Sequence, residues 1–189
     1  MTAELIVLDA DAWRVWLGEH HQSSDGVWLV LAKKNVTTPT SLTYDQALEE
    51  ALCHGWIDAQ KRPENEQTWL QRFTPRSTRS IWSKINREKA ETLIATGAMK
   101  AAGLEAVESA KQDGRWKSAY DSSSKSTVPA DLQAALNHNP QARAFFQTLD
   151  RANRYAILWR IQTVKKAETR TRKVQQFIAM LERKQKIHQ

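Results

Sequence analysis

The sequence predicts an α+β protein, with a small antiparallel sheet and helices in the N-terminal half and a helical C-terminal half. Residues 27–32, V-W-L-V-L-A, form an unbroken apolar run of strand length, typical of a central strand covered on both faces. Residues 43–54 carry an apolar stripe at helical spacing. After Pro75 the pattern becomes helical as far as the C-terminus, and this order of elements indicates the fold class.

Two helices are expected on either side of the apolar strand in sequence. The first should cover residues 12–21, with Asp11 as its N-cap and Trp13, Trp16 and Leu17 facing the core. These three residues have the i, i+3, i+4 spacing that places side chains on one face of a helix.

The second helix, residues 43–54, has the clearest start and stop signals. Thr43 is placed to cap it, and Gln46 is placed to bond back to the cap as a capping-box partner. Gly55 follows directly and is suited to the positive φ that ends many helices.

Two antiparallel strands are expected next, over residues 56–60 and 67–73, joined by a polar loop centred on Asn65. Such a loop pairs Ile57 with Phe73 on one face, which the helix over residues 43–54 should cover together with Trp69.

The same register sets Asp58 opposite Arg72 on the other face, which also bears Trp56. An ion pair beside an aromatic floor is one arrangement that binds a small polar ligand. A purely structural cross-strand pair is the alternative. A slip of one residue would reverse the faces, so the predicted ligand-binding site exists only if this register is correct.

We expect three segments along the chain. Residues 1–120 form an α+β domain, residues 121–128 form a loop or linker, and residues 129–189 form a basic helical module packed on or beside it. Helix starts are expected near Ser83 or Asn86, Lys100, Pro129, Pro140, Asp150 and Lys166 or Ala167.

Composition favours the cytoplasm. The N-terminus lacks a basic leader, and the longest apolar run is far shorter than the ~20 residues that a membrane helix needs. Cys53 is the only cysteine, so no internal disulfide is expected.

The basic charge is concentrated at the C-terminal end. Residues 150–189 hold eleven Lys and Arg against three Asp and Glu, a net of +8, while the rest of the chain has a net of −1. Arg170, Arg172 and Lys173 could meet nucleic acid or another anionic partner. A solvated basic helix pair explains the same charge without any partner.

Cys53 and His54 are adjacent in the expected helix, so their side chains point about 100° apart and cannot form a catalytic dyad. A buried structural cysteine is one interpretation, and a thiolate activated by a cation such as Arg72 is the other. The five histidines show no metal-ligand spacing, and the chain has no phosphate-binding glycine motif. No metal or cofactor is therefore expected.

Basic and aromatic residues alternate just after the expected hairpin. Such interleaving occurs on surfaces that bind single-stranded nucleic acid. It also occurs where arginine side chains simply pack on tryptophan rings. The residues concerned are Arg72, Arg76, Arg79, Lys84 and Arg87, with Phe73 and Trp82.

Several long motifs resemble one family. They are S-L-T-Y-D-Q-A-L-E-E-A-L-C-H-G-W-I-D-A-Q, W-L-Q-R-F-T-P-R and S-I-W-S-K-I-N, followed by R-Y-A-I-L-W-R-I-Q-T. These pieces resemble the YdeI/OmpD-associated, or bacteriocin-protection, family of bacterial proteins. The resemblance implies an α+β N-terminal part and a helical C-terminal module.

We therefore expect a non-enzymatic cytoplasmic protein that binds a ligand or partner in stress or antimicrobial protection. The candidate ligand-binding residues are Cys53, Trp56, Asp58, Trp69, Arg72, Arg76 and Trp82. One alternative is a nucleic-acid-binding protein that uses the basic C-terminal helices. Another is an enzyme of unknown reaction with its site near Cys53, Asp58 and Arg72.

Overall fold

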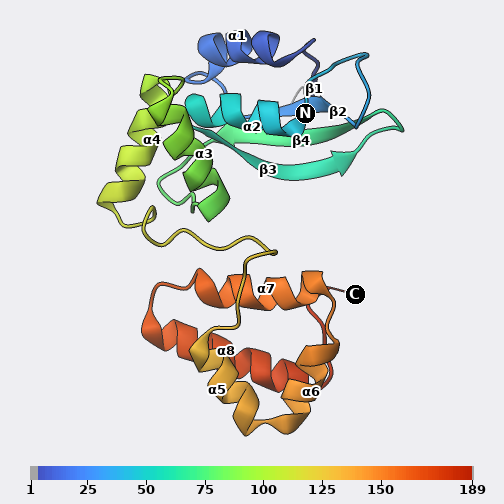
Figure 1. Ribbon diagram of the computed structural model, residues 1–189, viewed down its shortest axis with the longest axis vertical. Coiled ribbons are helices and arrows are strands. Elements are labelled where there is room, and N and C mark those ends of the chain that lie inside the picture. The colour runs from blue at the N-terminus through green and yellow to red at the C-terminus, as the bar shows by residue number, and fades with distance from the viewer. Residues whose placement is uncertain (1–3, 189) are drawn as a thin grey trace. The chain divides into compact units, whose positions relative to one another are not determined.

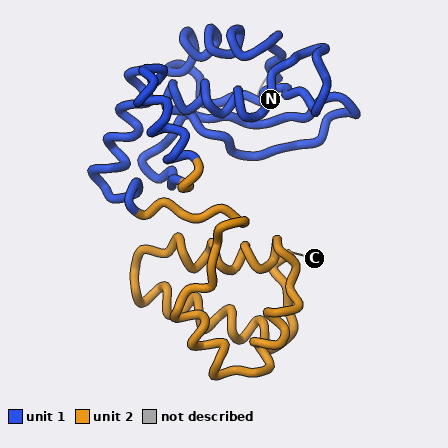
Figure 2. Tube along the Cα trace, in the orientation of Figure 1, with its two compact units in different colours: residues 1–82, 86–117 blue, residues 83–85, 118–189 orange. Residues whose placement is uncertain are grey.

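The computed structural model describes residues 4–188, and the chain divides into two compact units (Figure 2). The N-terminal unit comprises the chain up to Trp82 together with residues 86–117. The C-terminal unit comprises residues 83–85 and the chain from Ser118 onward. The sheet lies in the N-terminal unit and the C-terminal unit is helical, as expected for the predicted α+β fold class.

A four-stranded sheet lies in the N-terminal unit, in the order β1-β2-β4-β3. The strands are β1 (Glu4–Leu5), β2 (Val27–Ala32), β3 (Trp56–Pro63) and β4 (Thr68–Pro75). β2 pairs antiparallel with β4, and β4 with β3, whereas the short edge strand β1 runs parallel to β2. Two residues are too few to show alternation, so β1 was not predicted.

β2 is a central strand, as its apolar sequence predicts, and all six of its residues are buried. Helices α1 (Ala10–His20) and α2 (Tyr44–Cys53) lie on the same side of the sheet (Figure 1). The ring of Trp13 lies 5.8 Å from that of Phe73 on β4, so α1 packs on this face. The indole N–H of Trp13 also donates to the carbonyl of Ala47 on α2, which ties the two helices together.

The N-cap of α1 was predicted two residues too late. Asp9, not Asp11, caps the helix, and its carboxylate accepts a hydrogen bond from the backbone N–H of Ala12. Asp11 lies in the first turn and pairs instead with Arg14 at 2.7 Å. Both aspartates precede apolar helical residues, so the sequence alone did not distinguish them.

The predicted start and end of α2 are confirmed. Thr43 and Gln46 form the complete capping box. Gly55 follows the helix with a φ of +75°, in the left-handed region that favours glycine.

Two further helices, α3 (Lys84–Ala95) and α4 (Ala101–Gln112), follow the sheet. α4 begins beside the end of α2, where the backbone N–H of Lys100 donates to the carbonyl of Cys53 at 3.1 Å. This contact brings one face of α4 close to the turn between α2 and β3.

The C-terminal unit contains α5 (Ala130–His138), α6 (Pro140–Thr148), α7 (Arg151–Gln162) and α8 (Ala167–Glu182). Asp150 caps α7 as predicted, and Pro140 begins α6 behind an Asn139 cap. The four helices bury a single apolar cluster, which includes Leu132, Leu136, Phe146, Leu149, Ile157, Ile161, Val174, Phe177 and Leu181. Within residues 4–188, no helix is both long enough and apolar enough to span a bilayer.

Candidate functional site

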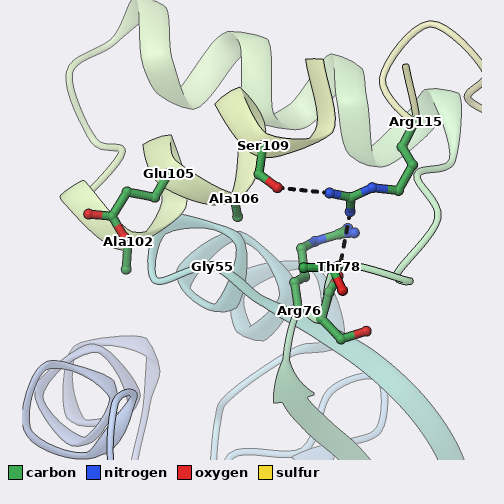
Figure 3. Close-up of a pocket in the computed structure, with 9 residues that line it drawn as sticks. Gly55, Arg76, Thr78, Ala102, Glu105, Ala106, Ser109 and Arg115 are labelled. Atoms are coloured by element: carbon green, nitrogen blue, oxygen red, sulfur yellow. Dashed lines mark hydrogen bonds between the residues drawn. The ribbon is translucent and has the colours of Figure 1, made fainter. Parts of the chain in front are cut away.

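The N-terminal unit contains a cavity of about 250 Å³ where β4 ends beside α4 (Figure 3). Its walls are residues 76–78, which follow β4, one face of α4, and Arg115; Gly55 also borders it. This volume corresponds to about eight water molecules at ~30 Å³ each. It lies slightly below the ~300 Å³ at which drug-sized pockets begin, so it suits a ligand of few atoms.

One face of α4 supplies the wall of small side chains. Ala102, Glu105, Ala106 and Ser109 recur at the three- and four-residue spacing that aligns side chains on one helical face. The two alanines leave the space that a larger side chain would fill. Glu105 is the charged residue of this face, and Figure 3 shows it at the opposite end of the cavity from Arg115.

Gly55 allows α4 to come close. A Cβ atom built at this position would lie 2.7 Å from the carbonyl oxygen of Ala102. Any larger residue would therefore push α4 away from the turn and change the shape of the cavity.

Arg115 is a buried guanidinium held in one orientation. Only 5% of the residue is exposed. Its Nε donates to the Asp113 carboxylate at 2.6 Å, and its Nη1 and Nη2 donate to Ser80 O at 2.9 Å and Ser109 Oγ at 3.0 Å. The carboxylate offsets the buried charge, and the hydrogen bonds fix the group at the cavity wall.

Arg76 adds a second guanidinium to the same wall. Its Cζ lies 3.5 Å from the centroid of the Trp82 ring, and Trp82 packs in turn against Trp116 at 4.8 Å. Nη1 donates to the carbonyl of Ile81. Arg76 and Trp82, both candidates from the sequence, therefore meet through the packing of arginine on tryptophan.

Comparison with known families gives one match in each half of the chain. Residues 5–106, more than half of the 189, match a family described as a domain of unknown function (DUF8412). The chain belongs to the DUF8412 family. Residues 125–184 match the family described as bacteriocin-protection, YdeI or OmpD-associated, so the resemblance seen in the sequence is confirmed. No curated protein and no solved structure matches the chain.

The cavity lies mainly in the DUF8412 domain. Gly55, Arg76 and Glu105 fall inside that match, while Ser109 and Arg115 follow its end. The motifs between residues 41 and 86 that resembled the YdeI/OmpD-associated family lie wholly inside the DUF8412 match.

The predicted strand register is wrong by one residue. Asp58 faces Phe73 and Ile57 faces Thr74, whereas Arg72 faces Trp28 on β2. Because directly paired residues point to the same side of a sheet, Asp58 and Arg72 lie on opposite faces. The ion pair between them, and the cleft built on it, do not form.

A β-bulge, and not the loop alone, explains the error. The strands pair as far as Pro63 and Trp69, so the loop is centred on Glu66 rather than Asn65, which moves each partner by two positions and leaves the faces unchanged. The side chain of Asn65 accepts the backbone N–H groups of Gln67 and Thr68 at 2.8 Å each and so shapes the turn. A bulge between Asp58 and Lys61 adds one residue to β3, so the register at Asp58 differs by one from the predicted register and Asp58 lies on the face opposite Arg72.

Asp58 and Trp69 meet a different partner, Tyr44 of α2. The Tyr44 hydroxyl donates to the Asp58 carboxylate at 3.0 Å, and its ring centroid lies 5.9 Å from that of Trp69. Trp56 lies on the same helix-covered face and is only 1% exposed. It therefore belongs to the core and cannot line an open cleft.

Cys53 has the environment of a structural residue. It is 3% exposed, and burial raises the pKa of its thiol to about 11. The adjacent His54 bonds through Nδ1 to the carbonyl of Glu50, and desolvation lowers its pKa. Neither group is arranged to activate the other.

The three C-terminal candidate residues differ in the contacts that they make. Arg170 donates to both carboxylate oxygens of Asp131, at 2.6 and 3.0 Å, and to the carbonyl of Ile161. Lys173 lies 6.0 Å from the Phe177 ring, and Arg172 is exposed. Arg170 therefore holds α8 to α5, and nucleic-acid binding by this end stays a prediction.

Sequence reasoning missed Glu105, Ser109 and Arg115 as site residues. The signal was present as a face of small and polar residues on α4 and as the turn at Asp113-Gly114-Arg115. What the sequence lacked was the placement of residues 76–78 against that face. Among residues 4–188, no group of three or more His, Cys, Asp or Glu is arranged to hold a metal ion.

Proposed function

We propose that the N-terminal unit binds a small acid-bearing ligand in the cavity beside α4, without transforming it. The observation that carries the proposal is the pair of guanidinium groups, Arg76 and Arg115, on one wall of a cavity of about 250 Å³. Guanidinium groups are suited to carboxylates and phosphates because they carry a permanent positive charge together with N–H donors. Ser77, Thr78 and Ser109 supply hydroxyl groups around them.

The environments of Cys53 and Ser109 support binding rather than catalysis. Cys53 is buried, and the raised pKa keeps its thiol protonated near neutral pH. Ser109 is engaged by Arg115, which fixes it as a hydrogen-bond partner. The biological role we propose is stress or antimicrobial protection, and the description of the family matched by residues 125–184 supports it.

Isothermal titration of the whole protein tests the binding function. The probes are short carboxylic acids, inorganic phosphate and short amino acids. We expect at least one probe to bind, and Ala106→Leu to weaken that binding tenfold or more, about 1.4 kcal/mol, because leucine fills the cavity. Ala101→Leu is the matched control, since Ala101 is exposed on the same helix and does not line the cavity.

The cavity is not the binding site if the two variants bind equally well. If no probe binds the unchanged protein, the proposal itself fails.

The protective role has a separate test in cells. A strain without the gene should survive bacteriocins, cationic peptides or oxidative stress less well than its parent. The unchanged gene and the Ala101→Leu variant should restore survival, and Ala106→Leu should not. Unchanged survival of the deletion strain under all three stresses would remove the role and leave the binding function standing.

A further inference from the structure

The charges around the cavity are separated rather than of one sign. Arg76 and Arg115 are positive, Asp113 offsets Arg115, and the Glu105 carboxylate lies at the other end of the cavity (Figure 3). Two guanidinium groups and two carboxylates give a formal sum of zero. A simple anion would use only one end of this arrangement.

No structural role explains the position of Glu105. The residue is exposed, and within residues 4–188 its carboxylate makes no ion pair or side-chain hydrogen bond. Glu108 differs, since it pairs with Lys111 one turn further along the same helix. The Glu105 carboxylate is therefore available to a ligand that reaches the end of the cavity near the start of α4.

We propose that the ligand is a short amino acid, with a carboxylate bound by the guanidinium groups and an ammonium bound by Glu105. This inference rests on the proposed function and names the ligand class of the same site. An ammonium at Glu105 adds a charge-assisted hydrogen bond that a plain carboxylic acid cannot make.

Helix geometry sets the length of the ligand. Glu105 and Ser109 are four residues apart, about 6 Å along α4. Ser109 Oγ in turn lies 3.0 Å from Nη2 of Arg115, so it marks the guanidinium end. With one hydrogen bond at each end, this spacing suits roughly one to four carbon atoms between amine and carboxyl group.

The volume agrees with that length. A cavity of about 250 Å³ holds about eight waters and accepts a chain of similar heavy-atom number. Larger ligands such as nucleotides exceed it. A charged amine of this size gains little binding free energy from contact with the two alanines. The charged groups at the two ends of the cavity therefore determine which ligand binds.

Isothermal titration with matched pairs of probes tests the inference. The pairs are acetate with glycine, propanoate with 3-aminopropanoate, and butanoate with 4-aminobutanoate, which differ only by the ammonium group. We expect one amino acid to bind at least tenfold more tightly than its partner acid. In Glu105→Gln that advantage should disappear, while Glu108→Gln, on the same helix but outside the cavity, should keep it.

The outcomes separate the two proposals. If acids and amino acids bind the unchanged protein equally, or if Glu105→Gln keeps the advantage of the amino acid, the ligand class is wrong and the binding function stands. If neither kind of probe binds, both proposals fail. Glu105 is exposed, so Glu105→Gln should fold normally, and circular dichroism checks this.

Discussion

At the residue scale, the surroundings of Cys53 and Arg115 show how burial sets the chemistry of a polar side chain. Both are at least 95% buried. Arg115 has a carboxylate and several oxygen acceptors, so its charge is compensated where it stands. For Cys53 the largest influence on the pKa is desolvation, which favours the neutral thiol. One buried group is therefore charged and fixed, and the other is neutral.

We predict that the Cys53 thiol is unreactive in the folded protein. With a pKa of about 11, roughly one thiol in a thousand is ionised at pH 8, and burial also blocks access. Labelling with a chromogenic disulfide reagent should be at least ~100-fold slower in buffer than in urea. Cys53→Ser gives the blank. Rapid labelling of the folded protein would show an accessible, activated thiol instead.

At the element scale, the position of α4 depends on close backbone packing against the end of α2. A Cβ atom at Gly103 would lie under 3.0 Å from the carbonyl oxygens of Leu52 and Cys53 and from Met99 Sδ. Two of these neighbours are backbone atoms and cannot rotate away. Since the same helix carries the wall of the cavity, this packing also positions Glu105 and Ser109.

We predict that Gly103→Ala destabilises the N-terminal unit. Alanine gains about 1 kcal/mol of helix propensity, but the overpacked contact costs about 1–3 kcal/mol, and α4 must shift. Gly18→Ala on α1 is the matched control, because a Cβ there meets nothing within 4 Å and should stabilise by about 0.5–1 kcal/mol. Urea unfolding measures both changes. Equal stabilisation by the two substitutions would show that α4 does not pack this closely.

The edge of the sheet at β3 is protected by its sequence. Lys61, Arg62 and Pro63 are exposed at the end of the strand, and a bulge interrupts its pairing with β4. Charged residues, proline and bulges all oppose pairing of an edge strand with another chain. Arg62 also places its guanidinium 3.9 Å from the centroid of the Trp28 ring, covering part of the sheet face opposite α1 and α2.

At the scale of the whole molecule, the charge is unevenly spread, and part of the basic excess is internally compensated. The chain has a formal net charge of +7, and the last forty residues account for it. Asp131 accepts hydrogen bonds from Arg170 of this segment, and Asp121 accepts one from Lys84 outside it; these bonds are the leading reason that the pKa of each carboxyl is lowered. A carboxyl group with a lowered pKa stabilises the fold above its unfolded pKa.

We predict that Arg170→Gln lowers the free energy of unfolding at pH 7 by about 0.5–1 kcal/mol, since the pair with Asp131 is partly exposed. The difference from the unchanged protein should shrink as the pH falls below about 3.8, through the lowered pKa of Asp131, because protonation removes the ion pair. Thermal unfolding at several pH values measures this. Arg172→Gln is the control, and a pH-independent difference would show that Arg170 acts only by packing.

The sequence by itself determined most of the local structure. The central strand at residues 27–32, the capping box of Thr43 and Gln46, and the helix starts at Pro140 and Asp150 follow from patterns a few residues long. It also indicated the family of the C-terminal residues, where the motif R-Y-A-I-L-W-R-I-Q-T lies inside the match at residues 125–184.

Only the tertiary structure decided the register of the hairpin and the location of the cavity. The one-residue bulge between Asp58 and Lys61 reverses the faces of the side chains beyond it relative to the predicted pairing, and no local pattern predicted that bulge. The cavity joins residues 55, 76–78, 102–109 and 115, which are brought together by contacts between segments far apart in the chain. Glu105 resembles any exposed helical glutamate until the packing of α4 on the end of α2 places it at one end of a cavity that two arginines also line, because spacing along one helix says nothing about what faces it.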